Sequence, residues 1–99
     1  RIPYMSVDQN MFESDFLLWQ AFRAGRQEAF EAIYQKYVRT LYNYGYNLTR
    51  NAAVVEDAIQ DLFVYLHEHR STLGQTDNIK YYLLRSLRRL LAKNATRKE

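Results

Sequence analysis

Apolar residues recur every three or four positions along this chain, and this spacing constrains its fold more than any other feature. The pattern is clearest between residues 52 and 70, where the apolar positions are Val55, Ala58, Ile59, Leu62, Phe63 and Leu66. Such spacing places the side chains on one face of an α-helix, whereas a half-exposed strand needs strict alternation, which the sequence lacks. One proline and three glycines interrupt the chain very little. The sequence therefore predicts an all-α fold.

Four helices with short connections account for this pattern. We expect them to cover residues 15–24, 26–48, 52–70 and 79–94. The expected N-caps, chosen for side chains that accept hydrogen bonds from the first turn, are Ser14 or Asp15, Asn51, and Asp77 or Asn78. Gly25 should end the first helix. Helices joined in this way pack as a compact bundle of about four helices around one core.

The buried sides of two further helices follow from the same spacing. For the second helix we expect buried positions at Phe30, Ile33, Tyr34, Tyr37, Leu41, Tyr44 and Leu48. For the last helix we expect Ile79, Tyr82, Leu83, Leu87, Leu90 and Leu91. Gly45 lies inside the second helix, where it costs about 1 kcal/mol relative to alanine. We interpret it as a close contact between helices, with a kink as the alternative.

The domain organisation is simple for a chain of 99 residues. We expect an N-terminal arm over residues 1–13, some of it foreign to the natural protein, and a single helical domain over residues 14–94. Residues 95–99 are expected to form a frayed tail or the start of a linker. No apolar run approaches the roughly 18 residues of a membrane span, and no signal peptide is visible. We expect a cytoplasmic protein that does not insert into membranes.

Catalysis is not indicated by any residue pattern in the chain. The chain has no cysteine, which excludes disulfides, a cysteine nucleophile and most structural zinc sites. It also lacks a glycine-rich phosphate loop and a serine–histidine–aspartate arrangement. His67 and His69 are two positions apart, so on a helix they point about 200° from each other and cannot share a metal ion. We expect no enzyme activity, no metal site and no cofactor.

Charge is distributed unevenly along the sequence. Residues 79–99 contain seven basic residues and one acidic residue, a net charge of +6, whereas the remaining residues contain seven basic and ten acidic residues, a net charge of −3. Together these give the net charge of +3. A basic last segment on a mildly acidic body indicates one surface for a polyanion and another for a different partner. The alternative is a solvated helix face without a partner.

The acidic residues gather on one face of the third helix. Asp57, Gln60 and Asp61 have the spacing i, i+3, i+4, and Glu56 adds negative charge beside them. Like charges one turn apart destabilise an isolated helix by a few tenths of a kcal/mol. A face of this kind is typical of a surface that meets a basic partner.

The basic residues of the last helix form a flank of their own. Arg85, Arg88 and Arg89 lie within one turn, Lys93 extends the row, and Lys80 precedes it. A helix with one apolar side and one arginine side is suited to bind phosphates. Tyr81 can stack on an unpaired base, or it can pack against the bundle instead.

Taken in order, these segments resemble region 2 of the extracytoplasmic-function (ECF) sigma factors of the sigma-70 superfamily. The resemblance covers residues 15–93 and is carried by four segments: LLWQAFRAGRQEAFEAIYQKYVRTLYNYGYNLT (17–49), VVEDAIQDLFVYLHEHR (54–70), STLGQTDN (71–78) and IKYYLLRSLRRLLAK (79–93). Within the last segment, LRSLRR is similar to sigma factors of Bacteroidetes-like bacteria. Members of this family start transcription by binding, without catalysing a reaction.

The resemblance implies two partners, each with its own residues. The third helix is expected to bind the clamp helices of the largest subunit of RNA polymerase through Glu56, Asp57, Gln60 and Asp61. The loop between the last two helices is expected to capture a base flipped from the non-template strand of the promoter −10 element. Its residues are Ser71, Thr72, Leu73, Gly74, Gln75, Thr76, Asp77 and Asn78, with Leu73 and its neighbours lining the base pocket. The phosphate backbone would be held by Lys80, Arg85, Arg88, Arg89 and Lys93, with Tyr81 beside the bases.

The chain departs from the family pattern in two respects. Many members have asparagine at the position of Arg89, which instead can pair with guanine or bind phosphate, so the base preference stays open. The family normally continues into a helix-turn-helix domain that reads the −35 element. Because this chain ends at Glu99, we expect it to lack recognition at −35 and to bind DNA weakly on its own.

Two other functions stay open at this point. The first is a helical interaction domain that binds only a protein regulator resembling an anti-sigma factor, which its nine tyrosines favour because this residue type is enriched at interfaces. An anti-sigma factor is also an expected partner of an ECF sigma factor. The second is a reader of duplex DNA of the helix-turn-helix kind.

Overall fold

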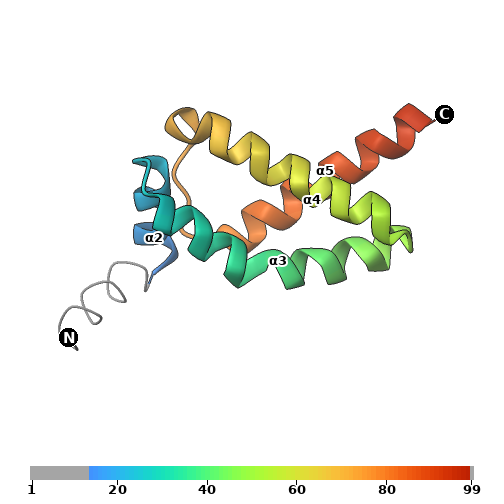
Figure 1. Cartoon of the computed structure of the whole chain (residues 1–99), viewed down its shortest axis with the longest axis horizontal. Helices are drawn as coiled ribbons and strands as arrows, with labels where there is room; N and C mark the ends of the chain where they lie inside the picture. The colour runs from blue at the N-terminus through green and yellow to red at the C-terminus, as the bar shows by residue number, and fades with distance from the viewer. Residues whose placement is uncertain (1–13, 99) are drawn as a thin grey trace.

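Four α-helices and one short 3-10 turn make up residues 14–98, the part of the chain that the computed structural model describes (Figure 1). The elements are α2 (Asp15–Arg23), α3 (Gln27–Thr49), α4 (Ala52–His69), η1 (Arg70–Thr72) and α5 (Ile79–Lys98). The predicted all-α fold is confirmed. The arm predicted for residues 1–13 lies outside the described residues.

The helices begin at the side chains that the sequence indicates. Ser14, Asn51 and Asn78 each accept a hydrogen bond from the backbone N–H three residues further on. These bonds satisfy donors that the first turn of a helix leaves unpaired. The N-cap of α2 is therefore Ser14, and Asn78 rather than Asp77 caps α5.

Two residues with positive φ mark the ends of α2 and α3. Gly25 follows α2 with a φ of 99°, a conformation that glycine adopts without steric cost. Arg50 ends α3 in the left-handed region with a φ of 57°. The sequence predicts the end of α5 at residue 94, whereas the helix continues through Lys98. Residues 95–98 contain neither proline nor glycine, so the sequence has no signal that would end the helix earlier.

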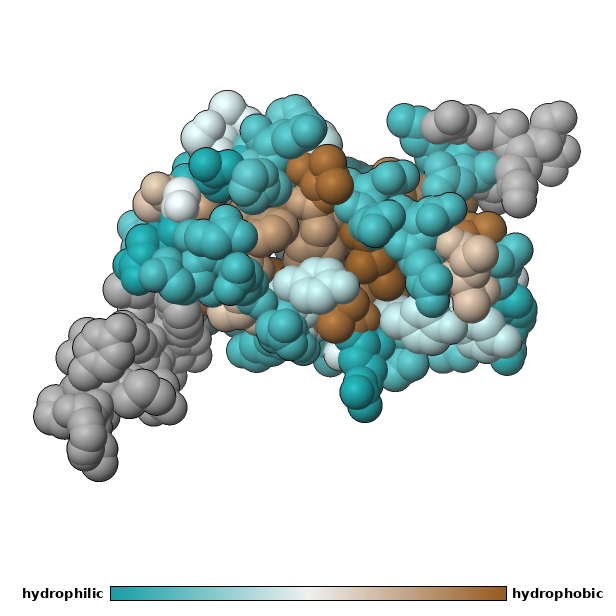
Figure 2. All heavy atoms as spheres, in the orientation of Figure 1, coloured by the Kyte–Doolittle hydropathy of each residue, from teal (hydrophilic) through white to brown (hydrophobic). Residues whose placement is uncertain are grey.

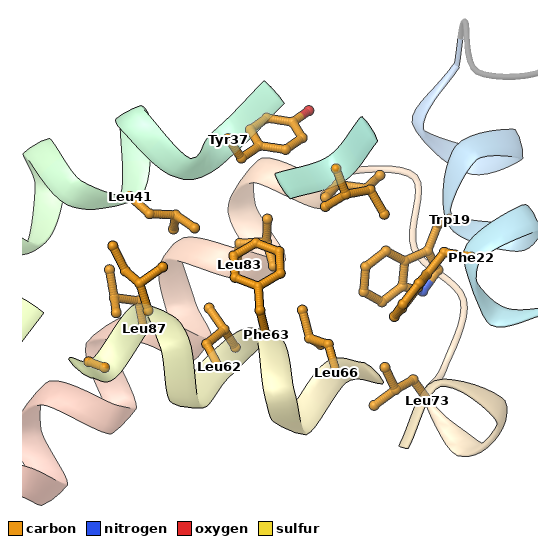
Figure 3. Close-up of a cluster of buried hydrophobic side chains, with 14 of the residues drawn as sticks. Trp19, Phe22, Tyr37, Leu41, Leu62, Phe63, Leu66, Leu73, Leu83 and Leu87 are labelled. Carbon is orange, nitrogen blue, oxygen red and sulfur yellow. The ribbon is translucent and has the colours of Figure 1, made fainter. Parts of the chain in front are cut away.

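The core lies between α3, α4 and α5, and α2 closes one end of it (Figures 1 and 3). The predicted buried stripe of α4 is confirmed at all six positions. In α5 the side chains at Ile79, Leu83, Leu87 and Leu91 are buried, while Tyr82 and Leu90 are half-buried. From α2, Trp19 and Phe22 enter the core with their ring centroids 5.0 Å apart.

The buried stripe of α3 is narrower than the sequence predicts. The buried positions, Ala29, Ile33, Tyr37, Leu41 and Gly45, are all four residues apart and form a single ridge against the other helices. The prediction was wrong for Tyr34 and Leu48, whose side chains are 41% and 53% exposed. Tyr34 follows the buried residue Ile33 in the sequence, and its side chain lines a groove between α3 and α4.

At Gly45 the helices α3 and α4 approach each other closely. A Cβ atom at this position would lie 2.8 Å from Cγ1 of Val55. Side chains do not pack at such a distance, so the helices approach this closely only because residue 45 is glycine. The predicted close contact between helices is confirmed.

Candidate functional site

The acidic face of α4 is exposed along its length. Glu56, Asp57, Gln60 and Asp61 all lie at the surface. No basic side chain among residues 14–94 forms a salt bridge with these three carboxylates. Their negative charge is therefore available to a basic partner.

A groove of about 760 Å³ runs between α3 and α4, and Figure 2 shows it as a hollow with apolar walls. Aromatic rings from both helices line it: Phe63 of α4 meets Tyr34 at 5.0 Å and Phe30 at 6.0 Å between ring centroids. Val64 lies at its border with 53% of its surface exposed. The sequence does not predict this groove, because the spacing of Tyr34 is that of a core residue. An apolar residue outside the buried stripe, such as Val64, was the signal for it.

The groove divides the predicted acidic face into two parts. Glu56 and Gln60 line the groove, whereas Asp57 and Asp61 do not. On the helix, Val64 lies between these two pairs, since it follows Gln60 by four positions and Asp61 by three. The exposed face of α4 thus combines an apolar centre with carboxylates on both sides.

The basic flank of α5 lies at the surface as the sequence indicates. Lys80, Arg85, Arg88, Arg89 and Lys93 are all exposed. Within residues 14–94 these cations form no salt bridge with an acidic side chain. Arginine side chains in such a row present several N–H donors to anions and are suited to phosphate binding.

Tyr81 projects from the first turns of α5 into solvent. Its side chain is 62% exposed, so the alternative that it packs against the bundle is wrong. Its neighbour Tyr82 turns inward instead, with its ring centroid 5.0 Å from that of Trp19. Burial raises the pKa of Tyr82, and the guanidinium of Arg89 acts in the opposite direction.

The loop that precedes α5 is exposed except at two positions. Ser71 and Thr72 belong to the 3-10 turn η1. The side chains of residues 71, 72, 75, 77 and 78 are exposed, and Thr76 is half-buried. Leu73, expected to line a base pocket, packs in the hydrophobic core and is only 8% exposed (Figure 3). The surface of the loop is therefore formed by its polar residues and by Gly74.

The histidines of α4 take part in aromatic packing. His67 meets Phe30 at 5.2 Å between ring centroids, and His69 stacks on Tyr65 at 4.1 Å. In the described part of the chain no three histidine or carboxylate side chains form a group able to hold a metal ion. Nor does any helix there have the length and apolarity to cross a membrane.

The bundle, with an acidic face on one helix and a basic flank on the next, defines a helical binding module. The family model of sigma-70 region 2 matches residues 33–99, more than half of the chain, and the chain belongs to this family. Sigma region 2 domains bind the core of RNA polymerase and melt promoter DNA in transcription initiation, and they catalyse no reaction themselves. Helix α2 lies before the matched residues. Searches of the curated proteins and of the solved structures return no significant match.

Proposed function

We propose that this domain is region 2 of an ECF sigma factor, which docks on the clamp helices of RNA polymerase and captures the non-template strand of the −10 element. The observation that carries the proposal is the pairing of two unpartnered charged faces, acidic on α4 and basic on α5, in one bundle. The exposed polar loop that joins these helices supports it further. An origin in Bacteroidetes-like bacteria rests on the LRSLRR segment alone.

For the polymerase, the docking surface is the exposed face of α4 together with the groove. Asp57 and Asp61 would meet basic side chains of the clamp helices, since neither carboxylate pairs with a basic side chain of residues 14–94. Glu56 and Gln60 border the apolar groove, which would take apolar side chains of the same partner. A central apolar contact surrounded by polar residues is the usual arrangement of a protein interface.

For the promoter, the binding surface is the loop of residues 71–78 together with the outer side of α5. Extruding a base from the duplex costs a few kcal/mol, which contacts in the bound state must offset. Stacking of a base on the exposed ring of Tyr81 contributes about 1–3 kcal/mol. The arginines of α5 hold phosphates, and Arg89 either does the same or pairs with guanine.

A second candidate is a domain that binds only a protein regulator of the anti-sigma kind. The groove favours it, because Tyr34 and Val64 expose apolar surface of the type that protein partners cover. The two functions are compatible in one protein, since a regulator on these faces would block the polymerase. A domain with this second function alone would bind no oligonucleotide even at low salt.

Salt dependence of DNA binding tests the proposed function on α5. A fluorescein-labelled single-stranded oligonucleotide is first selected from a randomised pool with the wild-type chain, and its affinity is measured by anisotropy at several salt concentrations. Replacing Arg85 and Arg88 with alanine should weaken binding and lower the slope of log affinity against log salt by roughly 0.7 per lost phosphate contact. The charge-matched control carries Arg39→Ala on α3 and Arg50→Asn at the α3–α4 turn, where asparagine tolerates the left-handed conformation.

Three outcomes distinguish the candidates. A reduced slope in the double variant, with the control close to wild type, supports phosphate binding by α5. Absence of oligonucleotide binding at low salt favours the regulator-only domain. Tighter binding to the duplex than to the single strand of the same sequence favours a duplex reader.

A further inference from the structure

Helix α2 is joined to the loop of residues 71–78 by three hydrogen bonds. Trp19 Nε1 donates to the carbonyl oxygen of Gly74 at 2.7 Å. Arg23 Nη1 donates to Oε1 of Gln75 at 3.2 Å, and Nε2 of Gln75 donates in turn to the carbonyl oxygen of Phe16 at 3.1 Å. The side-chain amide of Gln75 is thus held on both its oxygen and its nitrogen by α2.

The same helix holds the start of α5. Oδ2 of Asp15 accepts a hydrogen bond from the backbone N–H of Ile79 at 2.9 Å. Tyr37 donates to Oδ1 of the same carboxylate at 3.3 Å, and Nζ of Lys36 lies 3.8 Å from it. A carboxylate is favourable here because the N-terminal end of a helix carries unpaired N–H donors and a partial positive charge. Both ends of the segment from Gly74 to Ile79 are therefore fixed to α2.

The packing of buried side chains reinforces these hydrogen bonds. The indole of Trp19 is fully buried and meets the ring of Tyr82, the residue next to the exposed Tyr81. Leu73 lies in the same core and anchors the loop beside Gly74. Arg23 is half-buried, and its Nε atom is shielded from solvent. The loop and the first turn of α5 cannot shift without disturbing α2.

We propose that α2 is a positioning element, whose residues Trp19 and Arg23 set the loop and the first turn of α5 in the conformation that receives an unpaired base. This inference rests on the proposed function of the loop. A loop that is ordered before it binds loses less conformational entropy on binding and therefore binds more tightly. Trp19 and Arg23 act through Gly74 and Gln75 and make no contact with DNA themselves.

A double-mutant cycle between Arg23 and Gln75 tests this role. The variants are Arg23→Met, which keeps the length of the side chain without its donors, Gln75→Ala, and the two combined. The probe is the selected single-stranded oligonucleotide described above. Loss of one exposed hydrogen bond should weaken binding about threefold in Arg23→Met, with an unchanged salt slope. In the Gln75→Ala background the same substitution should have no further effect, because its partner is already absent.

Hydrogen exchange supplies a readout that separates positioning from general destabilisation. In Arg23→Met the backbone amides of Asn78 and Ile79, which donate to Thr76 Oγ1 and Asp15 Oδ2, should exchange about threefold faster, while those of α4 exchange as in the wild type. The Arg50→Asn chain, which loses the same charge at the other end of the bundle, should match the wild type in both measurements (Figure 1).

Each contrary result has a distinct meaning. If Arg23→Met weakens binding equally in both backgrounds and lowers the salt slope, Arg23 contacts a phosphate directly and the positioning role is wrong. Wild-type affinity in Arg23→Met also overturns it, and the proposed function of the loop then stands. If the wild-type chain selects no oligonucleotide, the proposed function itself fails, and the inference fails with it.

Discussion

At the scale of single residues, Tyr37 has a pKa that lies far above the ordinary value of a tyrosine. Its ring is buried beside α2, and its hydroxyl donates to the carboxylate of Asp15. Burial, helped by the negative charge of Asp15, raises the pKa of Tyr37 to about 12. The phenol therefore stays protonated in the folded domain over a pH range in which an exposed tyrosine ionises.

This raised pKa predicts a loss of stability at high pH. The folded state keeps the Tyr37 proton between its ordinary pKa of 10.0 and about 12, whereas the unfolded state releases it. The stabilisation is fully present below the unfolded pKa and is lost as the pH rises through the folded one. Urea unfolding at about pH 9 and about pH 11 should show a larger loss for the wild type than for Tyr37→Phe, which cannot ionise. An equal loss in both proteins would contradict the assignment.

At the scale of elements, the crossing of α3 and α4 depends on Gly45. A Cβ there would lie 2.8 Å from Cγ1 and 3.3 Å from Cγ2 of Val55, with Leu87 behind it. Branched side chains so close to the backbone cannot move aside without disturbing the core. The angle and separation of these two helices, and with them the groove, follow from this contact.

The substitution Gly45→Ala should therefore destabilise the domain, although alanine favours helix. Overpacking of this kind costs about 1–3 kcal/mol, against a gain of about 1 kcal/mol in helix propensity. Chemical denaturation measures the net change. In a Val55→Ala background the clash is absent, and the same substitution should be neutral or stabilising. A rise in stability in the wild-type background would show that the helices separate easily.

The helices themselves were predictable because their signals are local. The stripe of α4 and the caps Ser14, Asn51 and Asn78 depend on residues within three or four positions of one another. The groove was not predictable, because it depends on how α3 and α4 are arranged in space, and no local pattern in the sequence specifies this. Tyr34 is therefore exposed although its spacing is that of a core residue.

The candidate site likewise has features that the sequence predicts and features that it does not. The exposure of the charged rows on α4 and α5 follows from helical periodicity, and the structure agrees with it. The hydrogen bonds between α2 and the loop join residues that are 52 to 59 positions apart in the chain, so no local pattern predicts them. The burial of Leu73 has the same origin, since it depends on core residues that come from distant parts of the chain.

At the scale of the whole molecule, the domain carries opposite charges on two helices that pack against each other. The acidic residues of α4 remain unpaired among residues 14–94 even though α5 is strongly basic. The charges are thus directed outward, and each face attracts a partner of the opposite sign. This distribution agrees with the two partners of a sigma region 2 domain, RNA polymerase and promoter DNA.

The central claim, that the acidic face of α4 docks on RNA polymerase, is tested most directly by calorimetry with a purified fragment of the clamp helices. The variant carries Asp57→Lys and Asp61→Lys, and the control with the same charge change carries Glu28→Lys and Glu31→Lys on α3. We expect the wild type and the control to bind, and the α4 variant to lose at least about tenfold in affinity with its helicity intact. Binding of the α4 variant as tight as that of the wild type would contradict the assigned face.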